Sequence, residues 1–220
     1  MGSITTAPTT RFKKGLMSAE YCLNPDTDFT ADTTTGSATL TNVSSLAGLA
    51  VGMRVVGSGI PMNTMIARIL SDTSIRLSEE ATATAATVDL LGEADQINFA
   101  LIKAAPTGDY GEDTESYNEL TGNADETAGT GYTAGGFALT NVGPTLSGAV
   151  ALADFSPDPS WTDASFSTQG ALIYDDRRRG PIAMPAISVH SFGGAQTVTA
   201  GTLTIVLPVP SAEAAILRIQ

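Results

Sequence analysis

The residue types that carry out most enzyme chemistry are sparse in this sequence. His190 is the only histidine and Cys22 is the only cysteine. His190 stands next to Ser191, but a Ser-His-Asp triad places its nucleophile in a strained turn, and the chain has no G-x-S-x-G motif. We therefore predict that the protein is not an enzyme and has no catalytic residues, and we interpret His190 as a histidine on the surface of a strand.

Metal and cofactor sites are likewise not predicted. A structural zinc site of the Cys/His type requires four ligands, which one cysteine and one histidine do not supply. The stretch from Pro106 to Thr130 is acidic, but it lacks the D-x-D-x-D-G spacing of a calcium loop, and we predict a long solvated loop that can contact partners. Gly57-Ser58-Gly59 lacks the lysine and the following helix of a phosphate-binding loop, so it is interpreted as a turn. The carboxylates of the acidic stretch are Asp109, Glu112, Asp113, Glu115, Glu119, Asp125 and Glu126.

The candidate interface residues of the sequence are arginines. Arg177, Arg178 and Arg179 follow two aspartates at a predicted hairpin tip. They could bind an acidic patch of a neighbouring subunit through bidentate Arg–carboxylate pairs, or form a charged turn balanced by Asp175 and Asp176. Residues 1–11 are polar and predict a disordered arm, which we expect to become ordered by docking on a neighbouring subunit. Arg11, at the end of this arm, is a further tentative interface residue.

The sequence predicts β-strands that would position these residues. From Trp161 to Tyr174 one parity is apolar or small and the other is polar, until both become apolar near the end, which predicts a half-buried strand that becomes fully buried. The alternation of 202–207 and of 215–219 predicts neighbouring antiparallel strands of one β-sandwich. A short helix is expected between Arg11 and Tyr21, because Phe12, Leu16 and Met17 have helical spacing.

Short strands separated by explicit turns indicate a small β-barrel-like or sandwich domain inserted into the chain. The expected division is an N-terminal arm with the first element over 1–27, the insert over 28–91 and the main β-sandwich domain over 92–220. The fold class is therefore all-β. The expected strands of the insert are Ser37–Val43, Met53–Val56, Thr64–Leu70, Ser74–Leu77 and Thr87–Leu91.

Length and charge limit the partners. The chain has 220 residues and a formal net charge of −12, and such a surface repels nucleic-acid phosphates and anionic membranes. Neither a signal peptide nor an apolar run long enough to span a membrane is present, so synthesis in a cytoplasm is expected.

Three stretches together resemble a group of small virion structural proteins of tailed bacteriophages. They are 95–103 (DQINFALIK), 131–136 (GYTAGG) and the W-x-x-A-x-F-x-x-x-G-A-L-I-Y pattern of 161–174. In that group a short N-terminal element leads directly into the D-x-I-x-x-A-L strand, whereas here about 28–91 intervene. The intervening residues resemble a separate phage-associated β module, with S-A-T-L-T, G-L-A-V-G-M-R-V-V-G-S-G-I-P and T-x-I-A-x-I motifs.

The resemblance implies a protein of the virion that works by assembly. We expect a capsid decoration or cement protein, or a head-associated collar or fibre protein, that contacts other virion proteins and forms a homo-oligomer, with a trimer as the guess. The alternative is a receptor- or carbohydrate-binding module of a tail fibre. In that alternative Tyr110, Tyr117 and Tyr132, with Asp109 and Glu112, form the sugar site.

Overall fold

The structure is a computed structural model and describes residues 1–18, 20–176 and 182–219. Its fold is all-β and β-sandwich-like, as predicted, with several antiparallel sheets and two short helices among the described residues. The chain folds into two compact units. The main unit contains residues 1–20, 96–140 and 144–220, and the insert unit contains residues 21–95 and 141–143. The predicted insert, 28–91, lies inside the second unit.

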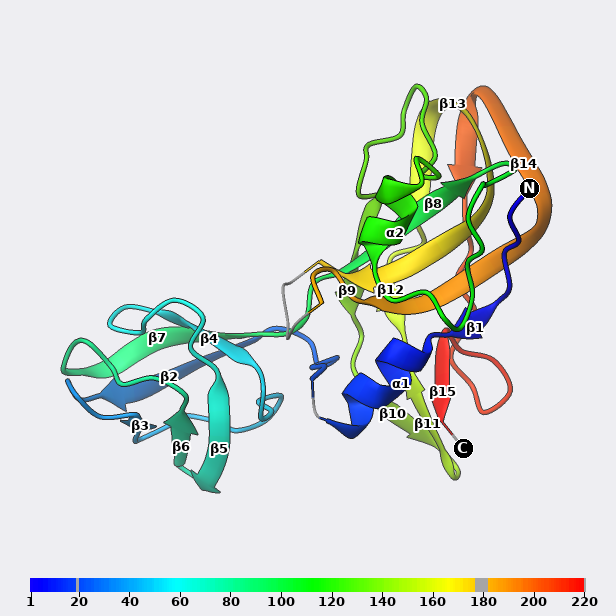
Figure 1. The fold of residues 1–220 in the computed structure, drawn as a ribbon. Coiled ribbons are helices and arrows are strands. Elements are labelled where there is room, and N and C mark those ends of the chain that lie inside the picture. The colour runs from blue at the N-terminus through cyan, green and yellow to red at the C-terminus, as the bar shows by residue number, and fades with distance from the viewer. Residues whose placement is uncertain (19, 177–181, 220) are drawn as a thin grey trace. The chain divides into compact units, whose positions relative to one another are not determined.

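A six-stranded sheet forms the centre of the main unit. The strands follow the order β1-β14-β13-β8-β9-β12, and long, curved β13 and β14 run side by side in Figure 1. β13 pairs antiparallel with β14 on one side and with β8 on the other, so its inner half is covered on both edges. The strands of this sheet are β1 (Ala7–Pro8), β8 (Ile97–Lys103), β9 (Phe137–Asn141), β12 (Phe155–Ser156), β13 (Ser160–Asp175) and β14 (Ala186–Thr204).

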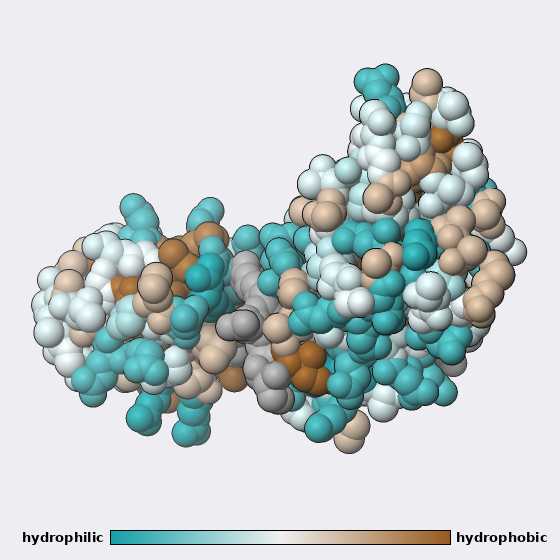
Figure 2. All heavy atoms as spheres, turned by 45° about the horizontal axis from the view of Figure 1, so that its top comes forward, coloured by the Kyte–Doolittle hydropathy of each residue, from teal (hydrophilic) through white to brown (hydrophobic). Residues whose placement is uncertain are grey.

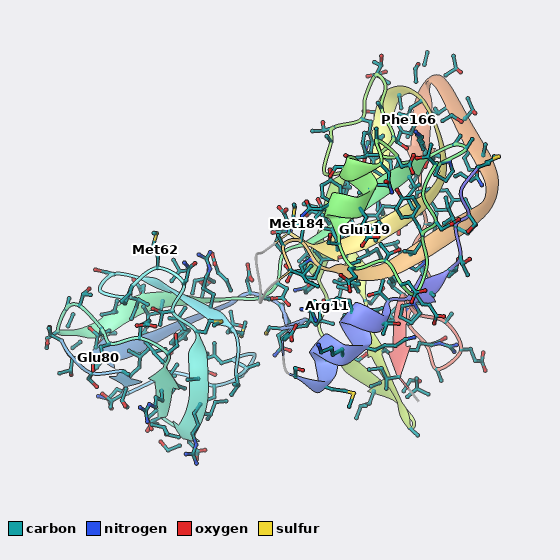
Figure 3. The ribbon with its side chains drawn as sticks, viewed as in Figure 1. Arg11, Met62, Glu80, Glu119, Phe166 and Met184 are labelled. Carbon is teal, nitrogen blue, oxygen red and sulfur yellow. The ribbon has the colours of Figure 1, made fainter. Side chains whose placement is uncertain are left out.

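Burial along β13 confirms the alternation predicted for this stretch. Ala164, Phe166 and Thr168 are buried while the residues between them are half-buried, and every residue from Gly170 to Asp175 is buried. Rings from neighbouring segments surround Trp161, whose ring centroid lies 6.0 Å from that of Tyr132. Figure 3 labels Phe166 within this part of the main unit. The other aromatic rings near Trp161 are Phe99, Phe137 and Phe166.

Of the later segments predicted to be neighbouring antiparallel strands of one β-sandwich, 202–204 pair with β13 as expected, but 215–219 do not. Residues 202–204 are the end of the 19-residue strand β14, and 205–207 lie beyond it. β15 belongs instead to a separate three-stranded sheet with the order β10-β11-β15. Alternation specifies which face of a strand is buried but not which strand becomes its neighbour. The strands of this second sheet are β10 (Thr145–Ser147), β11 (Val150–Ala153) and β15 (Leu217–Ile219).

Two short helices complete the main unit. α1 spans Thr10–Met17, and Thr9 is its N-cap. The side-chain oxygen of Thr9 accepts a hydrogen bond from Phe12 N at 3.1 Å, which satisfies one of the free backbone donors at the start of the helix. The helix predicted between Arg11 and Tyr21 is thereby confirmed. α2 (Tyr117–Gly122) was not predicted, because the acidic stretch that contains it was expected to be a loop.

The insert unit contains two three-stranded sheets with the orders β2-β7-β4 and β3-β6-β5 (Figure 1). Every strand predicted here has a counterpart, but β2 was missed because its sequence, TDFTADT, contains three threonines and two aspartates. The strands are β2 (Thr27–Thr33), β3 (Thr39–Leu40), β4 (Arg54–Gly57), β5 (Ile66–Ser71), β6 (Ser74–Leu77) and β7 (Ala85–Glu93). The buried aliphatic and aromatic side chains between them include Phe29, Leu40, Val43, Met53, Val55, Ile66, Ile75, Leu77 and Leu90.

Two glycines, one in 131–136 and one in 161–174, are required by close backbone packing. Gly136 has φ +82°, and a Cβ there would lie 2.1 Å from the carbonyl oxygen of Phe99. At Gly170 a Cβ would lie 2.6 Å from the carbonyl oxygen of His190 and 3.0 Å from methyl groups of Ile4. Both positions therefore accept only glycine without a shift of the neighbouring chain.

Candidate functional site

The N-terminal arm docks on the main unit of its own chain. The Tyr110 amide donates to the carbonyl of Ser3 at 2.9 Å, and the Thr5 amide donates to the carbonyl of Tyr110 at 2.8 Å. The side chain of Asp109 accepts from both the amide and the hydroxyl of Ser3 at 2.8 Å. These contacts are made within one chain and place the arm without a neighbouring subunit, so the expected docking on such a subunit stays a prediction.

The second half of the arm extends the central sheet. β1 pairs antiparallel with β14, with Ala7 opposite Val189 and Pro8 opposite Ser188. Thr9, fully buried, donates its hydroxyl hydrogen to the carbonyl of Ala186 at 2.7 Å while its oxygen caps α1. Composition predicted disorder because the arm has little to bury, but here the backbone supplies the hydrogen bonds that hold it.

Arg11 is engaged within the main unit. Its guanidinium forms an ion pair with the carboxylate of Glu20, and only 8% of its side chain is exposed. Figure 3 shows Arg11 on α1. The interface role of Arg11 stays a prediction, and the side chain already has a carboxylate partner and little exposed surface within its own chain. Arg177, Arg178 and Arg179 lie outside the described residues, so their predicted interface role stays a prediction.

The acidic stretch from Pro106 to Thr130 is not the solvated loop that was predicted. Tyr110, Tyr117 and Leu120 are buried in the core of the main unit, and Asp125 is fully buried with them. These three apolar and aromatic side chains were the signal in the sequence, since Tyr117 and Leu120 are spaced to share one face of a helical turn. Asp109, Glu112, Asp113 and Glu115 are the exposed carboxylates of the stretch.

Asp125 is held by a ring of hydrogen-bond donors. Its carboxylate accepts from the amides of Gly108 at 2.7 Å and Thr107 at 2.9 Å, and from the Tyr110 hydroxyl at 2.9 Å. The Lys103 ammonium lies 2.9 Å from Oδ1. Burial raises the pKa of Asp125, but the amides of Gly108 and Thr107, Lys103 and Tyr110 together lower this pKa far below its usual value. This carboxylate is therefore a structural anion that fastens 103–110 to the segment after α2.

Glu126, the next residue, is hydrogen-bonded to two tyrosines. Its carboxylate accepts from the hydroxyls of Tyr117 at 2.6 Å and Tyr132 at 2.8 Å, and from the amide of Gly135 at 2.7 Å. Tyr117 stacks on Tyr174 with ring centroids 4.4 Å apart. Burial, and then the charge and hydrogen bond of Glu126, raise the pKa values of Tyr117 and Tyr132. Burial raises the pKa of Tyr174 to about 12.

The tyrosines proposed for a sugar site are thus part of the interior. Tyr110 is 2% exposed and Tyr117 is 8% exposed, and the hydroxyls of both donate to internal carboxylates. Tyr132 is half-buried, and its hydroxyl oxygen also accepts from the Leu101 amide at 3.0 Å. A sugar-stacking platform requires exposed ring faces, so this set of residues is wrong for a carbohydrate site.

His190 lies on β14, as expected of a strand histidine, but it is half-buried rather than on an open surface. The Ser188 hydroxyl lies 2.9 Å from its Nε2 atom. Burial lowers the pKa of His190 to about 4, so the imidazole is neutral at pH 7. No carboxylate of the described residues hydrogen-bonds the imidazole, and this pair lacks the third, orienting group of a triad.

Groups of three or more metal-binding side chains do not occur in the described part of the chain. Within the same residues no helix is both long and apolar enough to cross a membrane. On the face shown in Figure 2 both units are largely hydrophilic or intermediate, with a few separate hydrophobic residues.

Exposed apolar side chains of the main unit are concentrated at α1, β10, β15 and the segment before β15. Met17 is 91% exposed, and Val206 and Val209 are also largely exposed. A groove lies between α1 and β15. Comparison with known proteins finds no matching family model, no similar curated protein and no similar solved structure.

Proposed function

We propose that this chain is a bacteriophage virion structural protein, either a capsid decoration or cement protein or a head-associated collar or fibre protein. In this role it stabilises the particle through contacts between subunits and carries out no chemistry of its own. The resemblance of 95–103, 131–136 and 161–174 to small phage virion proteins supports the proposal, as does the resemblance of the inserted residues to a phage-associated β module.

The observation that carries the proposal is that acidic and tyrosine side chains of the main unit are hydrogen-bonded internally, whereas several aliphatic side chains are exposed. The carboxylates of buried Asp125 and half-buried Glu126 and the tyrosines around them are engaged in hydrogen bonds within the main unit. At the same time aliphatic side chains such as Val206 and Val209 remain exposed. Exposed apolar groups on a rigid scaffold are typical of a protein that assembles with others.

The acidic surface agrees with a place on the outside of the particle. A net charge of −12 repels packaged DNA, and it leaves contacts with protein subunits as the natural source of binding energy. Within this proposal Arg177, Arg178 and Arg179 remain candidates for pairing with carboxylates of a neighbouring virion subunit, and Arg11, which pairs with Glu20 in its own chain, remains the weaker candidate.

The test is to locate the protein in particles of a phage that encodes it. We expect the chain to co-sediment with purified virions and antibody labelling to fall on the head or collar. Replacement of Arg177, Arg178 and Arg179 with Ser is expected to weaken co-sedimentation, and replacement of exposed Arg68 and Arg76 with Ser serves as the control. Absence of the chain from virions would overturn the proposal, and labelling at the tail tip would replace it with the receptor-binding alternative.

A further inference from the structure

The groove between α1 and β15 is apolar at its walls. It encloses about 580 Å³, and in Figure 1 the helix and the strand lie near each other in the main unit. Leu16 and Ile216 are half-buried, while Met17 and Ile219 are exposed to solvent. Exposed aliphatic walls around a hollow leave apolar area that a partner can remove from water. The lining residues are Pro8, Phe12, Lys13, Leu16, Met17, Ala215, Ile216, Leu217, Arg218 and Ile219.

A second exposed apolar segment of the main unit, here called the ridge, comprises residues 205–210, the sequence IVLPVP. Val206 is 76% exposed and Val209 is 83% exposed. None of the residues 205–210 lines the groove of the same chain. The chain therefore presents an apolar ridge and an apolar groove that are made of different residues.

Backbone hydrogen bonds anchor the first half of the ridge to the main unit. The Ile205 amide donates to the carbonyl of Pro159 at 2.9 Å, and the Leu207 amide donates to the side chain of Asp158 at 2.8 Å. Pro208 and Pro210 fix φ on either side of Val209 and have no amide hydrogen to satisfy. Little conformational entropy remains to be lost on docking, which favours binding through this segment.

The charges beside the two surfaces are opposite. Lys13 and Arg218, both exposed, line the groove. Asp158 and Glu213, also exposed, flank the ridge. In a chain with a net charge of −12, a basic edge is unusual, and opposite charges around an apolar contact fix its register and orientation.

We infer that Val206 and Val209 of one copy dock into the α1–β15 groove of a second copy. The ridge and the groove are different surfaces, so the contact is heterologous and builds either a closed ring or a chain of subunits. This inference rests on the proposed function, because it specifies the self-contact through which the subunits assemble.

Cysteine cross-linking tests the contact directly. Cys22 is the only native cysteine and is buried, so it does not compete with the introduced cysteines for disulfide formation. A Met17→Cys chain mixed with a Val209→Cys chain under mild oxidation is expected to give a disulfide-linked heterodimer. The control replaces Val209→Cys with Leu146→Cys, on the separate strand β10, where the side chain is 78% exposed. Equal cross-linking of the two mixtures would overturn the inference.

Sedimentation of the full chain gives an independent readout. We expect the wild type to associate with increasing concentration in the micromolar range. The double variant Val206→Asp, Val209→Asp is expected to associate about 100-fold more weakly, because it places two charges where the contact would bury two valines. Leu146→Asp should leave association unchanged. A wild type that stays monomeric, or a double variant that associates as well as the wild type, would contradict the contact.

The failures of the two proposals can be distinguished. Wild-type chain that binds virions but gives no preferential cross-link rejects the ridge–groove contact alone. A preferential cross-link in a chain that is absent from virions rejects the virion role and leaves the self-contact standing.

Discussion

The two units of this chain solve the problem of a stable β core in different ways. The insert unit is built from short strands whose buried cluster is dominated by aliphatic side chains such as Leu40, Ile66 and Ile75. The main unit holds two carboxylates, buried Asp125 and half-buried Glu126, in hydrogen bonds with tyrosine hydroxyls. It also uses its own N-terminal arm as an edge strand. The hydrophobic effect acts without direction, whereas buried hydrogen bonds require each donor to be in place.

This difference predicts that the two units respond to different perturbations, and each carries its own probe. Trp161, the only tryptophan, lies in the main unit and reports its unfolding by fluorescence. Cys22, the only cysteine, is buried in the insert unit and becomes reactive toward a thiol reagent when that unit opens. Measurements with these two probes on one sample therefore compare the units directly.

The largest effect is expected at Asp125. Asp125→Asn replaces one acceptor oxygen with an NH₂ group that faces the amides of Thr107 and Gly108, and it leaves Lys103 without its carboxylate. We expect the free energy of unfolding of the main unit to fall by about 4 kcal/mol, measured by Trp161 fluorescence in urea. Asp113→Asn, at an exposed carboxylate, is the control and should have no measurable effect. An equal loss in the Cys22 reactivity assay would show that the units do not respond separately.

Ile75→Ala tests the aliphatic core of the insert unit. Ile75 is fully buried on β6, opposite Leu40 on β3 and Ile69 on β5. Removal of its side chain is expected to lower the free energy of unfolding of the insert unit by about 3 kcal/mol through lost burial and the cavity left behind. Cys22 reactivity should increase while Trp161 fluorescence stays unchanged. Ile69→Ala, at the partly exposed partner, should cost clearly less.

Alkaline pH should weaken the main unit selectively. Burial raises the pKa of Tyr174 to about 12, above the value of about 10 in an unfolded chain, so the fold favours the neutral phenol. The contribution of Tyr174 to stability is complete below pH 10 and is lost as the pH rises from about 10 to about 12, which amounts to about 2 kcal/mol. Urea unfolding followed at Trp161 between these pH values measures it. Tyr174→Phe should reduce the slope, and an unchanged slope would contradict the assignment.

The smallest effect is expected at the start of α1. Thr9→Ala removes the cap on the Phe12 amide and the hydrogen bond to the carbonyl of Ala186. The expected loss is about 1 kcal/mol in the main unit. Thr9→Ser, which keeps the hydroxyl, should retain most of the stability. If Thr9→Ala instead destabilised the insert unit, the division of the chain into independent cores would be wrong.

The sequence predicted what depends on local patterns. Alternation identified the burial of β13 from Trp161 to Tyr174, and helical spacing identified α1. Turn residues separated the strands of the insert, where β6 (Ser74–Leu77) has the predicted bounds. β2 was missed because threonine and aspartate obscure its alternation, although Phe29 and Ala31 are buried in the core.

The candidate sites were harder to predict because charge alone does not tell whether a side chain is exposed. Arg11 was expected at an interface, but it pairs with Glu20 nine residues away. The acidic stretch was expected in solvent, but Asp125 finds its donors at 103–110. Such pairings depend on which loops the fold brings together, and no periodic pattern in the sequence encodes them.

By itself, the sequence determined the all-β class, the acidic character and the burial of one face of each well-patterned strand, because these follow from composition and from the two-residue period of a strand. The tertiary structure decided that β15 joins a separate sheet, that the arm covers the edge of β14, that Asp125 becomes buried and that Glu126 is hydrogen-bonded to tyrosines. These features arise from hydrogen bonds between residues far apart in the chain, which form only once the strands have been placed beside one another.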